Sequence, residues 1–128
     1  MNMLLDTHTA LWWINEHERL SSKAKKILLS GNHTLNVSIV SAWEIAIKVS
    51  IGKMSGLKGG IHTFINTLEN MPVRILPIHS RHIEAVETLP FIHRDPFDRL
   101  LIATAKAEGM TILTADENIP KYDVPSVW

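Results

Sequence analysis

Hydrophobic and polar positions along this chain predict β-strands that alternate with helices. Short apolar runs bounded by polar or turn residues predict strands at 3–6, 35–38, 73–78 and 111–114, with a last short strand that includes Val124. Apolar residues at helical spacing predict helices at about 11–14, 22–29, 41–51, 61–68, 80–88 and 96–108. Strands that alternate with helices favour an α/β fold, in which helices cover both faces of a parallel sheet.

Glycines mark helix ends and loops but do not divide the chain into separate domains. Gly52 and Gly109 are expected to end two of the helices, and Gly56, Gly59 and Gly60 indicate a loop. The sequence has no internal repeat, low-complexity tract or linker, and its 128 residues suit one compact domain. We therefore expect a single domain over residues 1–128.

The composition indicates a soluble protein of the cytoplasm. Hydrophobic residues make up 45% of the chain and charged residues 20%, which are ordinary values for a globular protein. Cysteine is absent, so disulfides, zinc–thiolate sites and thiol nucleophiles are excluded. The first residues lack a basic segment and reach Asp6 too soon for a signal peptide, and no apolar run is long enough to cross a membrane.

The charge balance gives only a weak indication of partners. The 13 basic and 13 acidic residues argue mildly against a passive nucleic-acid binder, which is usually basic overall. However, Lys48, Lys53 and Lys58 lie in a stretch without acids, and a bound divalent cation would offset clustered acidic residues. A role with nucleic acid therefore remains open.

The strongest chemical signal comes from four acidic residues, each at the end of a predicted strand or the start of a predicted helix: Asp6, Glu44, Asp98 and Asp116. In a parallel sheet these positions converge at the carboxyl ends of the strands, where ligands bind. Carboxylates gathered there suit Mg²⁺ or Mn²⁺, which most often act on phosphates. The hypothesis is a metal-dependent nuclease.

Asp6 and Glu44 each have a purely structural alternative. Asp6 is a suitable N-cap for the helix that follows it. Ser41 and Glu44 match a capping box, and Glu44 with Lys48 forms an i,i+4 ion pair. Because the helix around Glu44 is apolar nearly all round, we expect it to be buried, and a buried carboxylate needs a partner.

Asp95, Asp98 and Asp116 also have structural alternatives. Asp95 before Pro96 is the natural N-cap of the last long helix, and Asp98 again resembles a capping arrangement. Asp116 suits a turn after its strand. We assign Asp98 and Asp116 to the metal, and Asp95 to capping or to support of the metal ligands.

Several residues near the acids also have both a functional and a structural interpretation. Thr7 and Thr114 could hydrogen-bond beside the metal or serve in turns. His93, Arg94 and Arg99 could touch RNA phosphates or be solvated charges that balance local acids.

The histidines and tryptophans have simpler interpretations. No histidine spacing indicates zinc, so the seven histidines are expected at the surface. Trp12 and Trp13 are expected to be core or interface anchors rather than platforms for RNA bases.

With these residues placed, the chain resembles the PIN-domain nucleases, specifically the toxin subunits of bacterial VapBC-type toxin–antitoxin pairs. The resemblance covers nearly the whole chain and rests on four segments: LLDTH at 4–8, SAWEIAIK at 41–48, HRDPFDRLLIATA at 93–105 and LTAD at 113–116. Asp6, Glu44 and Asp98 match the three core acids of the family, and Asp116 matches a more variable fourth.

The resemblance implies an α/β/α sandwich with a mainly parallel sheet and Mg²⁺ or Mn²⁺ as the cofactor. It also implies endonucleolytic cleavage of RNA, a homodimer, and inhibition by an antitoxin protein. Two alternatives stay open. One is a catalytically silent binding module in which the acids only cap helices. The other is a receiver-type phosphoacceptor domain, which the sequence disfavours because no adjacent acid pair ends the first strand.

Overall fold

A five-stranded parallel sheet forms the centre of the molecule. The computed structural model describes residues 1–54 and 57–128, so the loop predicted at Gly56 lies outside the described residues. The strands are β1 (Asn2–Leu5), β2 (Thr34–Ser38), β3 (Arg74–Leu76), β4 (Thr111–Leu113) and β5 (Ser126–Val127). They are ordered β3-β2-β1-β4-β5, and every neighbouring pair is parallel. The predicted α/β class with a parallel sheet is confirmed.

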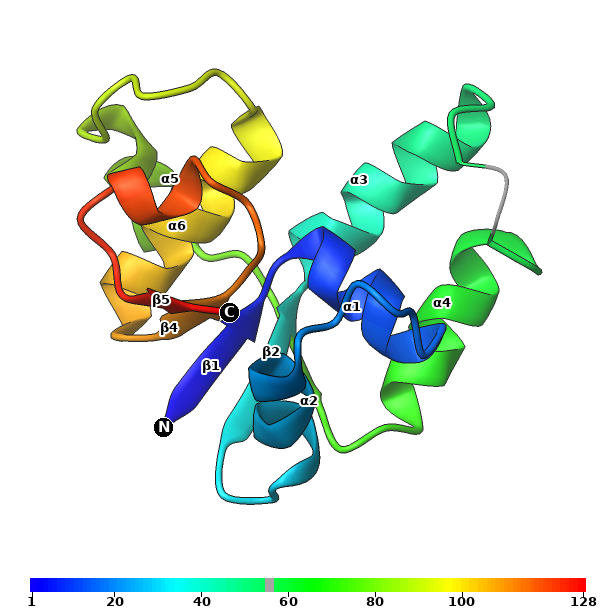
Figure 1. Cartoon of the computed structure of the whole chain (residues 1–128). Coiled ribbons are helices and arrows are strands. Elements are labelled where there is room, and N and C mark those ends of the chain that lie inside the picture. Colours follow the sequence, from blue (N-terminus) through cyan, green and yellow to red (C-terminus); the bar gives the residue numbers. More distant parts are fainter. Residues whose placement is uncertain (55–56) are drawn as a thin grey trace.

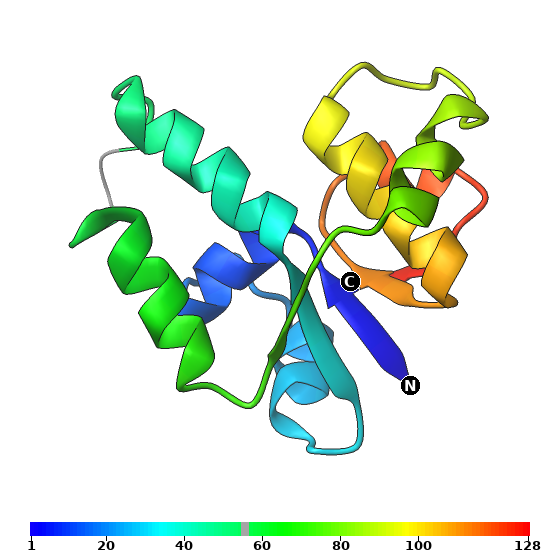
Figure 2. The same ribbon diagram turned by 180° about the vertical axis from the view of Figure 1, so that it is seen from behind.

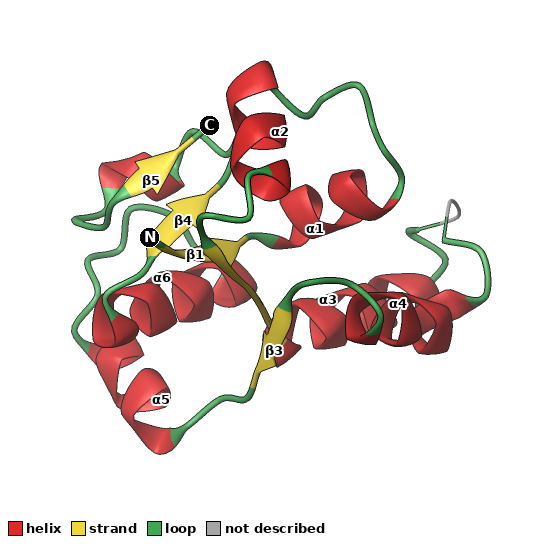
Figure 3. Cartoon of the chain, turned by 90° about the horizontal axis from the view of Figure 1, so that it is seen from below, coloured by secondary structure: helices red, strands yellow, loops and turns green. Residues whose placement is uncertain are grey.

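Helices cover both faces of this sheet (Figure 1). They are α1 (Thr7–Ile14), α2 (Ser22–Leu29), α3 (Ile39–Ser50), α4 (Gly60–Glu69), α5 (Ser80–Glu87) and α6 (Pro96–Glu108), with a short 3₁₀ helix η1 (Ile119–Lys121). Figure 2 shows α4 beside α3, and α5 beside α6. Figure 3 shows the strands between α1 and α2 on one side and α5 and α6 on the other. The arrangement is the expected three-layer sandwich.

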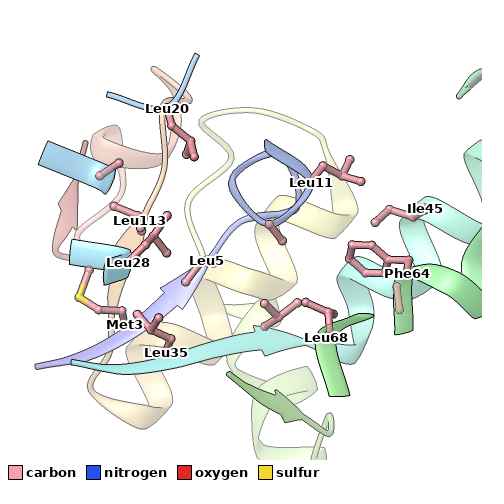
Figure 4. Close-up of a cluster of buried hydrophobic side chains, with 14 residues drawn as sticks. Met3, Leu5, Leu11, Leu20, Leu28, Leu35, Ile45, Phe64, Leu68 and Leu113 are labelled. Atoms are coloured by element: carbon pink, nitrogen blue, oxygen red, sulfur yellow. The ribbon is translucent and has the colours of Figure 1, made fainter. Parts of the chain in front are cut away.

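The alternation of side chains along β1 explains the two hydrophobic layers. Met3 and Leu5 pack with α1, α2, α3 and α4, whereas Leu4 between them packs with α6, η1 and part of α5. Successive side chains of a strand point to opposite faces, so an apolar run such as this one is buried on both. Figure 4 shows the first layer, in which Phe64 and Leu68 of α4 extend the cluster beyond the strands.

The ends of α6 follow local sequence rules and confirm the predicted bounds. The Asp95 side chain accepts hydrogen bonds from the backbone N–H groups of Phe97 and Asp98, at 2.9 and 3.0 Å. Pro96 occupies the first turn, where its missing N–H costs nothing. Gly109 ends the helix with φ 66°, a left-handed conformation that glycine adopts without a steric penalty.

The start of α3 differs from the prediction. Ser38 is the N-cap, since its hydroxyl accepts a hydrogen bond from the Val40 N–H at 3.1 Å, and the helix begins at Ile39. Ser41 lies inside the helix, so the predicted capping box of Ser41 and Glu44 is wrong. Both serines have suitable chemistry, but only Ser38 stands where the strand ends.

Two further differences concern the C-terminal segment. The last strand is Ser126–Val127, and Val124 instead packs into the hydrophobic layer beside α6. The 3₁₀ helix η1 was not predicted, because it is only three residues long. No helix within residues 1–54 and 57–128 is long and apolar enough to cross a membrane.

Candidate functional site

Asp6 occupies the centre of the carboxyl edge of the sheet, directly after β1 and at the N-cap of α1. Its Oδ1 accepts a hydrogen bond from the Thr9 N–H at 2.8 Å, and its Oδ2 accepts one from the Thr114 hydroxyl at 2.5 Å. The side chain is only 4% exposed. Burial raises the pKa of the Asp6 carboxyl, and the hydrogen bonds from Thr114 and Thr9 oppose that rise. Asp6 therefore caps α1 through Oδ1, while its Oδ2 contacts Thr114, which directly follows the neighbouring strand β4.

Glu44 is buried on α3 and is held by two groups from different elements. Its Oε1 accepts a hydrogen bond from the Thr7 hydroxyl at 2.7 Å, and its Oε2 lies 2.7 Å from the Lys48 ammonium. The Ser41 hydroxyl lies 2.9 Å from that of Thr7, which completes the contact between α1 and α3. The predicted ion pair of Glu44 and Lys48 is confirmed, as is the predicted burial of Glu44.

Asp98 lies in the first turn of α6 and carries the clearest electrostatic signal. The pKa of the Asp98 carboxyl is raised to about 7. Burial is the largest cause, and the negative charges of Asp95, Asp116 and Asp6 add to it, while a hydrogen bond from His93 opposes the rise. Like charges have this effect only when they lie close together. Asp98 is therefore near enough to the other acids for their charges to act on it.

Asp116 joins the site through Thr114. Its backbone N–H donates to the Thr114 oxygen at 2.9 Å, and the Thr114 hydroxyl in turn donates to Asp6. The Asp116 side chain accepts a hydrogen bond from the Asn118 N–H at 2.7 Å, which is the predicted turn role. Because β1 and β4 pair with Leu5 opposite Leu113, the residues that follow, Asp6 and Thr114, meet at the same edge.

The four acids thus gather at one edge, but they do not form a ready set of metal ligands. Within the described ranges, no group of three or more His, Cys, Asp and Glu side chains is placed to hold a metal ion. Threonine hydroxyls and Lys48 hold Asp6 and Glu44 in their present positions. The donor chemistry nevertheless fits a hard divalent cation, because the oxygens are carboxylate oxygens and their like charges raise the pKa of Asp98.

Comparison with known proteins identifies the family. The family model described as PIN domain matches residues 3–125, which is nearly the whole chain. The chain belongs to the PIN-domain family. This confirms the resemblance drawn from the sequence, and nothing supports the receiver-type alternative.

This PIN domain is similar to a curated protein named Ribonuclease VapC22, from Mycobacterium tuberculosis. The two are 29% identical, with 98% of each chain covered. Among solved structures, VapBC2 from Rickettsia felis, bound to a DNA fragment from its promoter, matches with a TM-score of 0.76, 20% identity and 100% and 99% of the two chains covered. FitAcB from Neisseria gonorrhoeae matches with a TM-score of 0.66, 18% identity and 98% and 96% coverage. These structures support the fold.

Arg99 of the PIN domain has a different environment from the one the sequence suggested. It is 5% exposed, and its guanidinium donates to the backbone carbonyls of Pro90 and Leu89 and to the Tyr122 hydroxyl. The predictions of a solvated charge and of a phosphate contact are therefore wrong: Arg99 holds the loop before α6 against the helix. Arg94, in contrast, is exposed.

His93 has a role that the sequence did not reveal. Its Nδ1 lies 2.7 Å from the Tyr122 hydroxyl, and its Nε2 lies 3.3 Å from Asp98 Oδ2. Tyr122 comes from the C-terminal segment, so only the tertiary structure could place it there. The contact links the η1 region to the acidic site and holds Asp98 in position.

The histidines and tryptophans differ in how far they follow the predictions. His82 is 2% exposed, so the expectation that all seven histidines lie at the surface is wrong. Its ring lies 2.7 Å from Glu108 on α6, which explains how an imidazole is accommodated in the interior. Trp12 and Trp13 are both half-buried, as core or interface anchors would be.

Proposed function

We propose that this chain is a Mg²⁺- or Mn²⁺-dependent endoribonuclease and the toxin of a toxin–antitoxin pair. The observation that carries the proposal is the convergence of acidic side chains at one edge of the sheet: Thr114 contacts both Asp6 and Asp116, and Thr7 contacts Glu44. Burial and the charges of Asp95, Asp116 and Asp6 also raise the pKa of Asp98 to about 7. A site that concentrates negative charge in this way is stabilised by a bound cation. The similarity to a protein named Ribonuclease VapC22 supports RNA as the substrate.

In the proposed site, Asp6, Glu44, Asp98 and Asp116 would hold the cation. When bound, it would supply the Lewis acidity that lowers the pKa of water and offsets charge on the scissile phosphate. The remaining residues keep the carboxylates in place. Thr114 and Thr9 orient Asp6, Thr7 orients Glu44, and His93 orients Asp98. Neither a histidine nor a serine nucleophile is required.

Asp6→Asn tests the proposal most directly. Asparagine retains the N-cap role and the shape of the side chain but removes the charge. We expect the purified variant to fold normally and to lose cleavage of tRNA and rRNA in the presence of Mg²⁺. Asp123→Asn is the matched control, because Asp123 is exposed and lies outside the site. Full activity of Asp6→Asn, in a preparation free of contaminating nuclease, would contradict the assignment.

Titration of the protein with Mn²⁺ separates this function from a catalytically silent binding module. An active PIN domain is expected to bind Mn²⁺ in a way that Asp6→Asn weakens. A module in which the acids only cap helices is expected to bind none in calorimetry. The cytoplasmic location stays a prediction from the sequence.

We propose that the antitoxin binds an apolar groove between α1, α2 and α4. The groove has a volume of about 380 Å³ and is lined mainly by apolar side chains: Trp13, Ile14, Leu20, Leu28, Leu29 and Met71. Leu29 at its rim is 79% exposed, which is unusual for leucine unless a partner covers it. The similar structures named VapBC are complexes of two kinds of protein, which favours such a partner here.

The exposed position of Leu29 allows a clean test of the groove. Leu29→Asp is expected to preserve the fold and to weaken the antitoxin complex at least tenfold, because the complex would bury an unpaired charge. Binding to the product of the adjacent reading frame, measured by calorimetry, provides the readout. Unchanged affinity would place the antitoxin elsewhere.

We also propose a homodimer that forms through the face made by α3, α5 and the start of α6. Trp43 and Ile83 are exposed there by 59% and 53%. Beside them lies an apolar hollow of about 290 Å³, whose lining includes Val40, Phe97 and Leu100. A two-fold interface requires each surface to complement itself, and a protruding indole next to an apolar hollow meets that requirement.

A further inference from the structure

A polar cavity lies at the amino end of β1, whereas the acidic site lies at its carboxyl end. It has a volume of about 310 Å³, and its lining includes Asn2, Arg74, His79, Arg81, His82 and Glu108. Asn2 begins β1 and Asp6 follows its end, so at about 3.3 Å per residue the two sites are roughly 13 Å apart along the strand. The cavity is bounded by β3, the segment between β3 and α5, the start of α5 and the end of α6.

Positive charge dominates this cavity although the whole chain is neutral. Arg74 and Arg81 contribute two guanidinium groups, and Glu108 contributes one carboxylate. The Nδ1 of His82 accepts a hydrogen bond from the His79 N–H at 3.1 Å, and its Nε2 lies 2.7 Å from Glu108. The two guanidinium groups therefore outnumber the single carboxylate of the lining by one charge.

One of the two guanidinium groups, that of Arg81, forms an ion pair with Glu108. Arg81 donates to Glu108 Oε1 through Nε at 2.9 Å and through Nη2 at 2.5 Å, and His82 meets the same oxygen. These hydrogen bonds lower the pKa of the Glu108 carboxyl, so it stays ionised. The network joins α5 to α6 and neutralises one guanidinium. It does not account for Arg74.

Arg74 takes no part in the network of Arg81, His82 and Glu108. It is exposed at the start of β3, and among the described residues it forms no ion pair. Asn2 adds a donor beside it. The Asn2 Oδ1 accepts a hydrogen bond from the buried Asn36 amide at 2.6 Å, so the Asn2 Nδ2 group can donate to another acceptor.

We propose that this cavity is a binding site for a phosphate-type oxyanion, with Arg74 as the principal ligand. A guanidinium presents paired N–H donors that match two oxygens of a phosphate, and the Asn2 amide adds a donor. The ionised Glu108 pairs with Arg81, so the positive charge left over among the lining residues is that of Arg74. The site is independent of the acidic edge and of any cleavage there.

The test uses the full-length protein in EDTA, so that no metal at the acidic edge can bind the probe. Pyrophosphate, 5′-AMP and a short RNA are titrated separately by calorimetry and by amide chemical shifts. We expect saturable binding with a Kd of about 1 mM or below, with shifts at Asn2, Arg74 and the start of α5. Tight binding of pyrophosphate and 5′-AMP would identify a free phosphate compound as the ligand, whereas preference for RNA would identify a backbone phosphate.

Arg74→Ala is expected to weaken this binding about tenfold, because a charge-assisted contact is lost. The affinity of Arg74→Lys should lie between those of Arg74→Ala and the unaltered protein, since lysine keeps the charge but loses the paired donors. Lys26→Ala, which removes an exposed positive charge on α2, is the matched control and should bind normally. No saturable binding by the unaltered protein, or equal binding by Arg74→Ala, would overturn the proposal. Nuclease activity is not a readout, so a failure here leaves the proposed function unaffected.

Discussion

At the scale of single residues, the acids of this protein combine structural and chemical roles. Asp6 caps α1 through one oxygen and meets Thr114 through the other. Asp116 closes a turn with its side chain, while its backbone N–H reaches Thr114. A capping role therefore does not argue against a role in metal binding, because a carboxylate has two oxygens and several lone pairs.

The raised pKa of Asp98 predicts how stability depends on pH. The folded-state pKa of about 7 lies above the unfolded value of 3.8, so the folded protein binds this proton more tightly. The resulting stabilisation is complete below about pH 4 and is lost as the pH rises through 7. Burial raises the pKa of Asp6 as well, and its contribution has the same sign.

Asp98→Asn isolates this contribution. In EDTA, we expect the variant and the unaltered protein to have similar free energies of unfolding at pH 4, where Asp98 is protonated. At pH 8 the variant should be more stable, by on the order of 1 kcal/mol or more. Urea denaturation at a series of pH values provides the measurement. A difference that stays constant with pH would show that the Asp98 carboxyl does not titrate as described.

At the scale of elements, the N-terminus of α6 contains both the helix cap, Asp95, and a residue of the acidic site, Asp98. Asp95 accepts hydrogen bonds from two backbone N–H groups, and its charge also raises the pKa of Asp98 three residues later. Pro96 fixes the first turn, and Arg99 holds the preceding loop. Small changes at this helix end should therefore affect both stability and the acidic site.

A pair of substitutions at Asp95 separates the two effects. Asp95→Ala should lower the free energy of unfolding by about 1 kcal/mol, because it removes the cap. Asp95→Asn should keep that stability, since asparagine caps as well as aspartate. Both variants should lower the pKa of Asp98, because each removes the nearby charge. Denaturation and a carboxyl NMR titration report these quantities, and an unchanged Asp98 pKa in both variants would contradict the electrostatic argument.

At the scale of the whole molecule, separate surfaces are available for separate partners. The acidic edge lies at the carboxyl ends of the strands, the apolar groove lies between α1, α2 and α4, and Trp43 lies on the face of α3, α5 and α6. The acidic edge shares α1, α3 and α6 with the other two surfaces, but each surface is formed by different residues, so substitutions on one should leave the others intact. The proposed dimer and the antitoxin complex can therefore be tested against each other.

Trp43→Asp is expected to disrupt the homodimer. A central tryptophan in an interface commonly contributes about 2 kcal/mol or more, so the dimer Kd should rise roughly thirtyfold. Analytical ultracentrifugation over a range of concentrations measures this change. Leu29→Asp serves as the control that keeps the dimer, and Trp43→Asp should in turn keep the antitoxin affinity. A dimer that persists in Trp43→Asp would require a different interface.

The sequence by itself determined the features that depend on local spacing and local chemistry. Periodicity placed the strands and helices, and Asp95, Pro96 and Gly109 specified both ends of α6. Because parallel strands bring their carboxyl ends to one edge, the convergence of the acids followed from the order of elements. The ion pair of Glu44 and Lys48 followed from their i,i+4 spacing.

Only the tertiary structure decided which partners each polar side chain meets. Thr114 reaches Asp6 across 108 positions of the chain because β1 and β4 pair in a particular register. Arg99 and His82 are buried because Tyr122 and Glu108, from other elements, supply acceptors for them. Trp43 is 59% exposed although its helix is apolar, and its ring meets that of Phe97 from α6 edge-on. Burial and charge pairing depend on contacts between distant segments, and local sequence patterns do not encode those contacts.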